Sequence, residues 1–362
     1  METMLAAVKV GARKVDIQEI PVPEISEDSA LMKIEAAGMC GAYATFTGKT
    51  TNKRSSVPGM NGHENAGVIV KAGKIFKSLH NVEEGELVAL EEYIPCLHCE
   101  WCRQGEYRHC WMTDTHNNPN HTRLTGGFSQ YLRLPLNSVL HKLPQHVSPD
   151  EAALALPIGN GVQWACVEGE AGPGKTIVVQ GPGSKGLGCV LASRMYGADT
   201  VIVTGLSKDQ RRFEAAKALG ADHTVDVQTN DFTKTIMDIT NGRGADAVID
   251  CTTGGSSVVF TQASSVLVRR GGIIVTQRYK VNEFDLEDIT GKYAQLRACR
   301  GHSYRSVETG LSWIASGRHP LKDMITHHYP VSRAADAFLA SGGEGDDGAN
   351  AVWVMMNPWM QN

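Results

Sequence analysis

Four of the nine cysteines stand close together, between positions 96 and 110. Cys96, Cys99, Cys102 and Cys110 spell the pattern C-x2-C-x2-C-x7-C. Four thiolates at this spacing can surround one tetrahedral metal ion, and zinc is the usual occupant. Because all four ligands are cysteine, no position stays open for a substrate, and we expect a structural zinc. Free thiols in a loop and a zinc-ribbon binding module are the alternatives, but chance rarely spaces four cysteines in this way.

A second group of possible metal ligands is divided between two short motifs. Cys40 stands in one of them, and His63 and Glu64 stand in the other, between Gly62 and Gly67. Thiolate, imidazole and carboxylate are all zinc ligands, and a catalytic zinc keeps one position open and acts as a Lewis acid. Alone, His63 could be a satisfied polar residue in a turn. The neighbouring Gly62 and Glu64 and the upstream Cys40 favour a metal.

A glycine-rich turn follows the apolar run at 176–180. Gly181, Gly183 and Gly186 form G-x-G-x-x-G between a predicted strand and a predicted helix, which is the context that the motif requires. The glycines permit a tight turn, a close approach of backbone to a pyrophosphate, and close packing of the helix on the strand. A dinucleotide site is therefore expected, the alternative being a glycine-rich turn without a nucleotide.

The end of the next predicted strand bears on the choice between NAD and NADP. An acidic residue there usually holds the ribose hydroxyls, but this chain has Gly205. Asp209, on the loop that follows, could reach the ribose, which favours NAD. Lys208, Arg211 and Arg212 could instead hold a 2′-phosphate, which favours NADP, or the two arginines could lie on a solvated helix face. We predict NAD and leave NADP open.

The elements that must position these motifs differ between two parts of the chain. Up to about residue 149, short strand-like runs at 5–10, 30–37, 66–70 and 86–90 alternate with prolines and glycines, which indicates an irregular antiparallel β domain. From residue 175, apolar strands alternate with helical segments, which indicates a doubly wound parallel sheet. The pattern loosens again after residue 297, and this tail is expected to rejoin the first domain.

The composition excludes several other classes of protein. The net charge is −4 and no basic stripe occurs, so nucleic acid is a poor partner. No apolar stretch is long enough to span a membrane. Residues 1–20 lack the apolar block and cleavage site of a signal peptide. We therefore expect a cytoplasmic protein that acts on a small molecule, without a nucleic-acid or membrane partner.

Taken together, these motifs resemble the zinc-containing medium-chain dehydrogenases, which include alcohol, sorbitol and threonine dehydrogenases. The resemblance covers nearly the whole chain. It implies a mostly β, GroES-like catalytic domain at 1–155 and 298–362 and a Rossmann domain at 156–297, zinc as metal cofactor, and a homodimer or homotetramer. The matching segments are those at 38–41, 62–67, 96–110, 126–131, 181–186 and 270–272.

Four positions depart from the family pattern. Ala42 stands where a Ser or Thr hydroxyl usually begins a proton relay, and Tyr43 stands where Asp is common. Thr45 replaces a histidine that often ends the relay. Leu156 falls where the third protein ligand of the zinc is expected, and leucine cannot bind zinc. The resemblance then implies a zinc bound by Cys40, His63 and Glu64 with water, or a site that has lost its metal.

Three functions follow from these observations. The main hypothesis is an NAD(P)-dependent alcohol dehydrogenase that transfers a hydride between a secondary alcohol or ketone and the cofactor. In it Tyr43, Thr45 or water held by Glu64 moves the proton, although Tyr43 and Thr45 could equally be packing residues. The first alternative is a zinc-free reductase of the same fold that acts on an activated alkene or carbonyl, which Leu156 favours. The second is a catalytically silent NAD(P)-binding protein.

Overall fold

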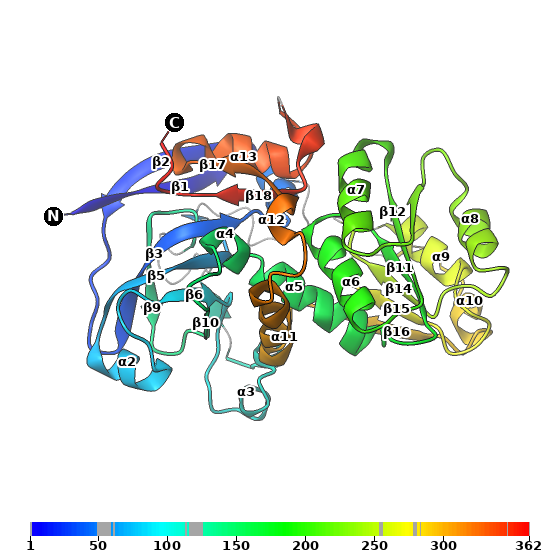
Figure 1. Cartoon of the computed structure of the whole chain (residues 1–362), viewed down its shortest axis with the longest axis horizontal. Coiled ribbons are helices and arrows are strands. Elements are labelled where there is room, and N and C mark those ends of the chain that lie inside the picture. The colour runs from blue at the N-terminus through cyan, green and yellow to red at the C-terminus, as the bar shows by residue number, and fades with distance from the viewer. Residues whose placement is uncertain are drawn as a thin grey trace. The chain divides into compact units, whose positions relative to one another are not determined.

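The computed structural model describes residues 2–48, 59–60, 62–112, 114–115, 126–252, 256–277, 281–282, 284–345 and 347–361. The chain forms two compact units (Figure 1), Met1–Leu156 with Ser303–Asn362, and Pro157–His302. The sequence placed the boundaries after residues 155 and 297. Residues 298–302 stay in the second unit, where the Trp164 indole N–H donates to the Gly301 carbonyl at 3.1 Å.

The first unit is built on a mostly antiparallel sheet with the strand order β10-β6-β5-β3-β18-β17, and β9 also pairs with β3. A smaller sheet has the order β2-β1-β4, and β7 pairs with β8. The strands are β1 (Thr3–Gly11), β2 (Lys14–Pro21), β3 (Ser29–Gly38), β4 (Gly59–Met60), β5 (Glu64–Ala72), β6 (Leu87–Leu90), β7 (Tyr93–Ile94), β8 (Asp114–Thr115), β9 (Tyr131–Pro135), β10 (Leu140–Lys142), β17 (Ile325–Tyr329) and β18 (Trp353–Met356).

The first unit also contains α-helices. They are α1 (Ala42–Thr47), α2 (Lys74–His80), α3 (Glu100–Arg103), α4 (Pro149–Ala152), α11 (Tyr304–Ala315), α12 (Leu321–Met324) and α13 (Ala334–Ser341). Of these, α2, α4, α12 and α13 contact the strands of the larger sheet. The start of α4 is fixed by a capping box between Ser148 and Glu151. In the core, Phe46 of α1 stacks on Phe338 of α13 with ring centroids 4.8 Å apart. This contact holds α1 directly after the predicted ligand Cys40.

The second unit is a parallel sheet with the order β13-β12-β11-β14-β15-β16, as the alternation of strands and helices predicts. Its interior is built mainly from aliphatic side chains such as Val178, Ile202, Val248 and Ile274, each fully buried, together with a few phenylalanines. The strand order reverses between β11 and β14, which is where a doubly wound sheet binds a dinucleotide. The strands are β11 (Thr176–Gln180), β12 (Thr200–Gly205), β13 (His223–Asp226), β14 (Ala247–Asp250), β15 (Ile273–Thr276) and β16 (Gln295–Ala298).

The helices of this unit connect successive strands. They are α6 (Ser184–Met195), α7 (Gln210–Ala218), α8 (Phe232–Ile239), α9 (Ser257–Ser265) and α10 (Glu287–Thr290), and α5 (Ala155–Gly161) precedes them. A π-helix at Val162–Glu168 continues α5. Such segments are rare and frequently occur at functional sites.

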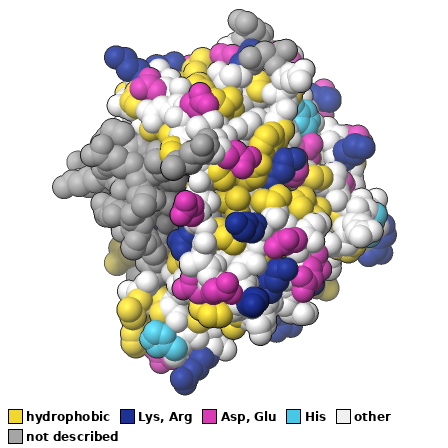
Figure 2. All heavy atoms as spheres, turned by 90° about the vertical axis from the view of Figure 1, so that its left-hand side faces the viewer, with side chains coloured by type: hydrophobic (Ala, Val, Ile, Leu, Met, Phe, Trp, Pro, Cys, Tyr) yellow, Lys and Arg dark blue, Asp and Glu magenta, His cyan; other side chains and the backbone are white. Residues whose placement is uncertain are grey.

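Acidic and basic side chains are interspersed on the face of the molecule that Figure 2 shows, so this face presents no basic stripe. Among the helices within the described ranges, none combines the length and the hydropathy that crossing a membrane requires.

Candidate metal centres and cofactor site

Strand pairing in the first unit brings the split ligand motif together. Cys40 follows the end of β3, and His63 immediately precedes β5. The two strands are antiparallel, with Gly38 opposite Glu64. Ligand atoms of Cys40, His63 and Glu64 therefore all lie within 4.8 Å of one another. The predicted thiolate, imidazole and carboxylate form one cluster, which we call the mixed cluster.

The mixed cluster depends on a very close approach of β3 and β5 at Gly38. A Cβ atom at Gly38 would lie only 2.3 Å from Oε2 of Glu64. No side chain larger than hydrogen fits there without moving the carboxylate. The Glu64 side chain is thereby held in the interior, where the residue is 2% exposed.

The surroundings of Glu64 fit a metal ion. Burial raises the pKa of the Glu64 carboxyl well above its usual range, and the neighbouring Cys40 thiolate adds to this effect. Oε1 of Glu64 is buried and finds no hydrogen-bond partner among the described residues. A buried carboxylate oxygen without a partner is costly, and coordination of a cation removes that cost. The donors suit zinc, which binds sulfur, nitrogen and carboxylate oxygen.

The residues that depart from the family pattern have different surroundings. Leu156 on α5 is 1% exposed and offers no ligand atom. The Tyr43 hydroxyl donates a hydrogen bond to Oε1 of Glu344, whose Oε2 pairs with Arg13 at 3.0 Å. This placement favours the packing role for Tyr43, because its proton is already directed at a carboxylate. Thr45 belongs to α1, but its side chain lies outside the described residues.

The four-cysteine cluster is assembled by local structure alone. Cys99 caps α3, Leu97 adopts a left-handed conformation with φ 63°, and Cys110 ends the 3₁₀ turn at Tyr107–His109. The Sγ atom of Cys102 lies 3.4 Å from that of Cys99 and 3.8 Å from that of Cys96. The pKa of the Cys96 thiol is lowered to about 6, mainly by a hydrogen bond from the backbone N–H of His98. Ligand atoms of all four cysteines lie within 4.8 Å of one another, as a tetrahedral zinc requires.

The cofactor turn begins where β11 ends. Gly181 has φ +94°, and Gly183 caps helix α6. A Cβ atom at Gly186 would lie 1.9 Å from the Gly181 carbonyl oxygen, whereas one at Gly183 would meet nothing within 4 Å. Gly186 thus permits the close packing of helix on strand, and open space faces Gly183. This cradle fits a pyrophosphate at the helix N-terminus.

The loop after Gly205 satisfies its own charges. The Asp209 carboxylate accepts the Leu206 N–H at 2.9 Å, lies 3.4 Å from Arg212, and belongs to a residue that is 6% exposed. The carboxylate therefore stabilises its own loop rather than being presented freely to a ribose. Arg211 pairs with Glu214 at 2.7 Å on the exposed face of α7.

A buried histidine that sequence reasoning missed lies near the four-cysteine cluster. Nε2 of His141 on β10 lies 2.8 Å from the buried carboxylate of Glu91, and its Nδ1 contacts Glu308 on α11. Burial opposes the charged imidazolium, but the hydrogen bonds with Glu308 and Glu91 outweigh it and raise the pKa of His141. The ring stacks on Tyr304, whose backbone N–H donates to the Gly105 carbonyl at 2.9 Å. Since these residues are far apart in sequence, no local pattern could have indicated them.

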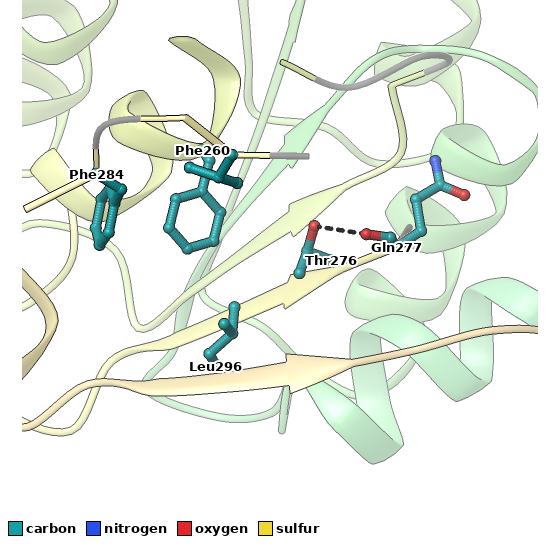
Figure 3. A pocket seen from close by; sticks show the side chains of 6 residues that line it. Phe260, Thr276, Gln277, Phe284 and Leu296 are labelled. Atoms are coloured by element: carbon teal, nitrogen blue, oxygen red, sulfur yellow. Dashed lines mark hydrogen bonds between the residues drawn. The ribbon is translucent and has the colours of Figure 1, made fainter. Parts of the chain in front are cut away.

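A pocket of about 370 Å³ lies in the second unit beside β15 and β16 (Figure 3). Its lining holds no acid, base or metal ligand, so we assign the chemistry to the clusters and the turn above. The lining residues are Phe260, Thr276, Gln277, Val281, Phe284 and Leu296.

Comparison with known proteins identifies relatives over the whole chain. Residues 26–145 match the model of the alcohol dehydrogenase GroES-like domain, and residues 186–316 match that of zinc-binding dehydrogenases. Sorbitol dehydrogenase of Bacillus subtilis is 32% identical over 350 residues, which cover 93% of each chain. D-arabitol-phosphate dehydrogenase of Enterococcus avium is 30% identical over 325 residues, 88% of each chain. A zinc-binding dehydrogenase of Sinorhizobium meliloti bound to NADP has the same fold, with a TM-score of 0.83, 23% identity, and coverage of 99% of this chain and 100% of that one.

Proposed function

Because the chain belongs to the zinc-containing medium-chain alcohol dehydrogenase family and is an NAD(P)-dependent oxidoreductase of secondary alcohols, we propose that Cys40, His63 and Glu64 hold its catalytic zinc. The observation that carries this proposal is the convergence of three different ligand types within 4.8 Å at the ends of β3 and β5. The four-cysteine cluster is proposed to hold a structural zinc. We further propose that the first unit is the catalytic domain and the second the cofactor domain.

In the mixed cluster, Cys40 supplies a thiolate, His63 an imidazole and Glu64 a carboxylate. Zinc bound there would act as a Lewis acid on the substrate oxygen. Glu64 must lose its proton to serve as a ligand, and its buried position ties metal binding to proton release. Leu156, at the position where the family has a third ligand, is buried and offers no ligand atom.

The route of the substrate's hydroxyl proton is proposed to run through Glu64 and water. Ala42 has no hydroxyl, and the Tyr43 hydroxyl donates to Glu344. Tyr43 could donate elsewhere only after that hydrogen bond breaks. Thr45 is still a candidate for proton transfer on the basis of the sequence. Normal turnover of a Thr45→Val variant would exclude it from that role.

The proposed substrate class is a polyhydroxylated secondary alcohol. Two similar proteins are named for sorbitol and for D-arabitol phosphate, which supports a polyol rather than a simple alcohol. We expect cofactor reduction with a panel of polyols and polyol phosphates and much slower reduction with ethanol or 2-propanol. Faster turnover of simple alcohols would contradict this assignment.

The proposed cofactor is NAD. Arg211 and Arg212 are paired with Glu214 and Asp209, so two of the three basic side chains that could hold a 2′-phosphate already have acidic partners. Titration of the protein with NADH and NADPH tests the choice. A preference for the phosphorylated cofactor of tenfold or more, about 1.4 kcal/mol, would overturn it.

Elemental analysis of the purified chain tests the catalytic zinc. Two zinc ions per chain are expected, with one left after Cys40→Ser. A single zinc in the wild-type chain that survives Cys40→Ser would favour the zinc-free reductase, for which the apolar Leu156 is the supporting observation.

We also propose a homodimer or homotetramer in the cytoplasm. Strand β16 is the edge of the parallel sheet, and its Leu296 is 54% exposed, which suits pairing with another copy. None of the nine cysteines, all of which lie within the described residues, forms a disulfide, which suits a reducing compartment. Sedimentation analysis that finds a monomer would contradict the assembly.

A further inference from the structure

Lys185 places a positive charge in the cofactor turn, at a position where a charged side chain does not help the helix to pack. It lies between Gly183 and Gly186, in the first turn of α6, a turn that contains no acidic residue. A positive side chain at a helix N-terminus is unfavourable, because the helix dipole already places partial positive charge there. Lys185 therefore does not stabilise the helix, and its contacts indicate another function of its charge.

The ammonium group of Lys185 is held in one place by two neutral partners. Nζ donates to Oε1 of Gln277 at 3.2 Å and lies 4.1 Å from the centroid of the Trp164 ring on the π-helix. Gln277 in turn donates from Nε2 to the Thr252 carbonyl at 2.7 Å. Figure 3 shows the Gln277 amide directed away from Phe260 and Phe284 of the neighbouring pocket.

Among the residues that the structure describes, Lys185 forms no ion pair, and its contacts are the amide and the indole. The sequence from 252 to 282, which contains the segments after β14 and β15, has no Asp or Glu at all. The cation is therefore fixed but not neutralised.

The direction of the Lys185 side chain identifies the half of the cofactor that it faces. Gly205, at the end of β12, marks the side of the sheet that binds the adenosine ribose, and Pro182 of the turn packs there: a Cβ at Gly205 would lie 2.9 Å from its Cδ. Lys185 instead contacts Gln277, which follows β15 and in turn donates to Thr252 after β14. These strands form the other half of the sheet, which takes the other nucleotide of a dinucleotide.

We propose that Lys185 is a fixed positive charge that makes the nicotinamide site prefer the reduced over the oxidised cofactor. The oxidised ring is a cation and the reduced ring is neutral, so a nearby ammonium disfavours only the oxidised form. In alcohol oxidation a hydride leaves the carbinol carbon, its two electrons cancel the ring charge, and the hydroxyl proton is released. Lys185 thereby shifts the equilibrium on the protein toward the bound reduced cofactor. This inference rests on the proposed assignment of NAD to the turn.

The test measures dissociation constants of NAD⁺ and NADH for the zinc-loaded protein by calorimetry and fluorescence. The wild type is expected to bind NADH more tightly. Lys185→Met should lower the ratio of the NAD⁺ constant to the NADH constant by about tenfold, the scale of charge effects in a partly buried site. Lys185→Arg should keep the ratio, and so should Lys217→Met, which removes an exposed charge from the last turn of α7.

Equal weakening of both forms in Lys185→Met would overturn the proposal, because it would make Lys185 a counterion of the pyrophosphate. An unchanged ratio would overturn it as well. Lys185→Gln provides a second neutral variant if the methionine variant does not fold. A wild-type chain that binds neither form would contradict the proposed function itself, which separates that failure from a failure of this inference.

Discussion

The two clusters of proposed metal ligands in the first unit are built by opposite means. The four-cysteine cluster draws identical ligands from one segment of 96–110, and a short helix and a 3₁₀ turn position all of them. The mixed cluster draws three different ligands from two segments, and the pairing of Gly38 with Glu64 brings them together. The first cluster offers four possible ligands and can be complete in itself, whereas the second, among the described residues, offers three and would suit a fourth from outside.

A closed site contributes to folding, whereas an open site depends on a fold that has already formed. A cluster of four thiolates gains its metal-binding energy as its own segment folds. The mixed cluster gains nothing until β3 and β5 are paired, and its buried carboxylate is then costly without a metal. Four variants test this difference between the two clusters.

Cys99→Ser tests the closed cluster and should have the largest effect. We expect the loss of one zinc per chain and a fall in the free energy of unfolding of about 5 kcal/mol or more, because the binding energy of a structural zinc is folding energy. Elemental analysis and thermal unfolding provide the measurements, with Cys40→Ser as the matched control. If both variants lower the melting temperature equally, the distinction between the clusters is wrong.

His63→Ala tests the open cluster and should affect catalysis more than stability. We expect kcat/KM to fall by about 10³, the scale seen when one electrostatic group is removed from an active site. The affinity for NADH should stay the same, because the cofactor turn belongs to the other unit. Normal turnover in this variant would remove the mixed cluster from the mechanism.

His141→Gln tests what stabilises the region beside the closed cluster. The pKa of His141 is raised in the folded state, so its contribution is fully present below about pH 6.5 and is lost as the pH rises through the higher folded value. We expect the free energy of unfolding of the variant at pH 6 to be lower by roughly 2 kcal/mol. This is less than for a fully buried ion pair, because the Glu308 side chain is half exposed. Denaturant unfolding should show that wild-type stability falls with rising pH while the variant changes less. If the stability of wild type and variant changed with pH in the same way, the conclusion that His141 is charged in the folded state would be wrong.

Tyr43→Phe should have the smallest effect. Its hydroxyl donates to Glu344, so we expect turnover within about twofold of the wild type, an unaltered pH profile, and a loss of about 1 kcal/mol in stability. The control is Ala42→Ser, which restores a hydroxyl at the family's relay position. A tenfold loss of turnover with a missing alkaline limb would instead support the proton-transfer role that the sequence suggested for Tyr43.

Much of the parallel sheet could be predicted because its strands are buried on both faces. The run at 176–180, in which three apolar residues stand between Thr176 and Gln180, coincides with β11 and is buried throughout. The edge strand β16 (Gln295–Ala298) keeps polar side chains and stays mostly exposed, so it gives a much weaker signal. The four cysteines were predictable from spacing alone. The hydrogen bond from Tyr43 to Glu344 was not, because it joins positions that only the packed first unit brings together.

The proposed role of Lys185 could not be predicted from the G-x-G-x-x-G pattern, because the pattern allows any residue at position 185. A basic residue opposing the helix dipole was the available signal, but its partners Trp164 and Gln277 come from distant segments. For the same reason the close approach at Gly38 escaped prediction, since strand register determines which glycine meets Glu64.

The pairing of β3 with β18 bears on how the chain is made in the cell. Gly38 lies opposite Met355, so the ribosome releases the last neighbour of β3 only after residues 157–302 have been synthesised. That continuous segment can fold as it emerges, and the four-cysteine segment can take up its metal early, while β3 keeps an unpaired edge. Unpaired strand edges promote aggregation. Premature termination just before β18 would therefore yield a chain with an intact cofactor unit and an aggregation-prone first unit.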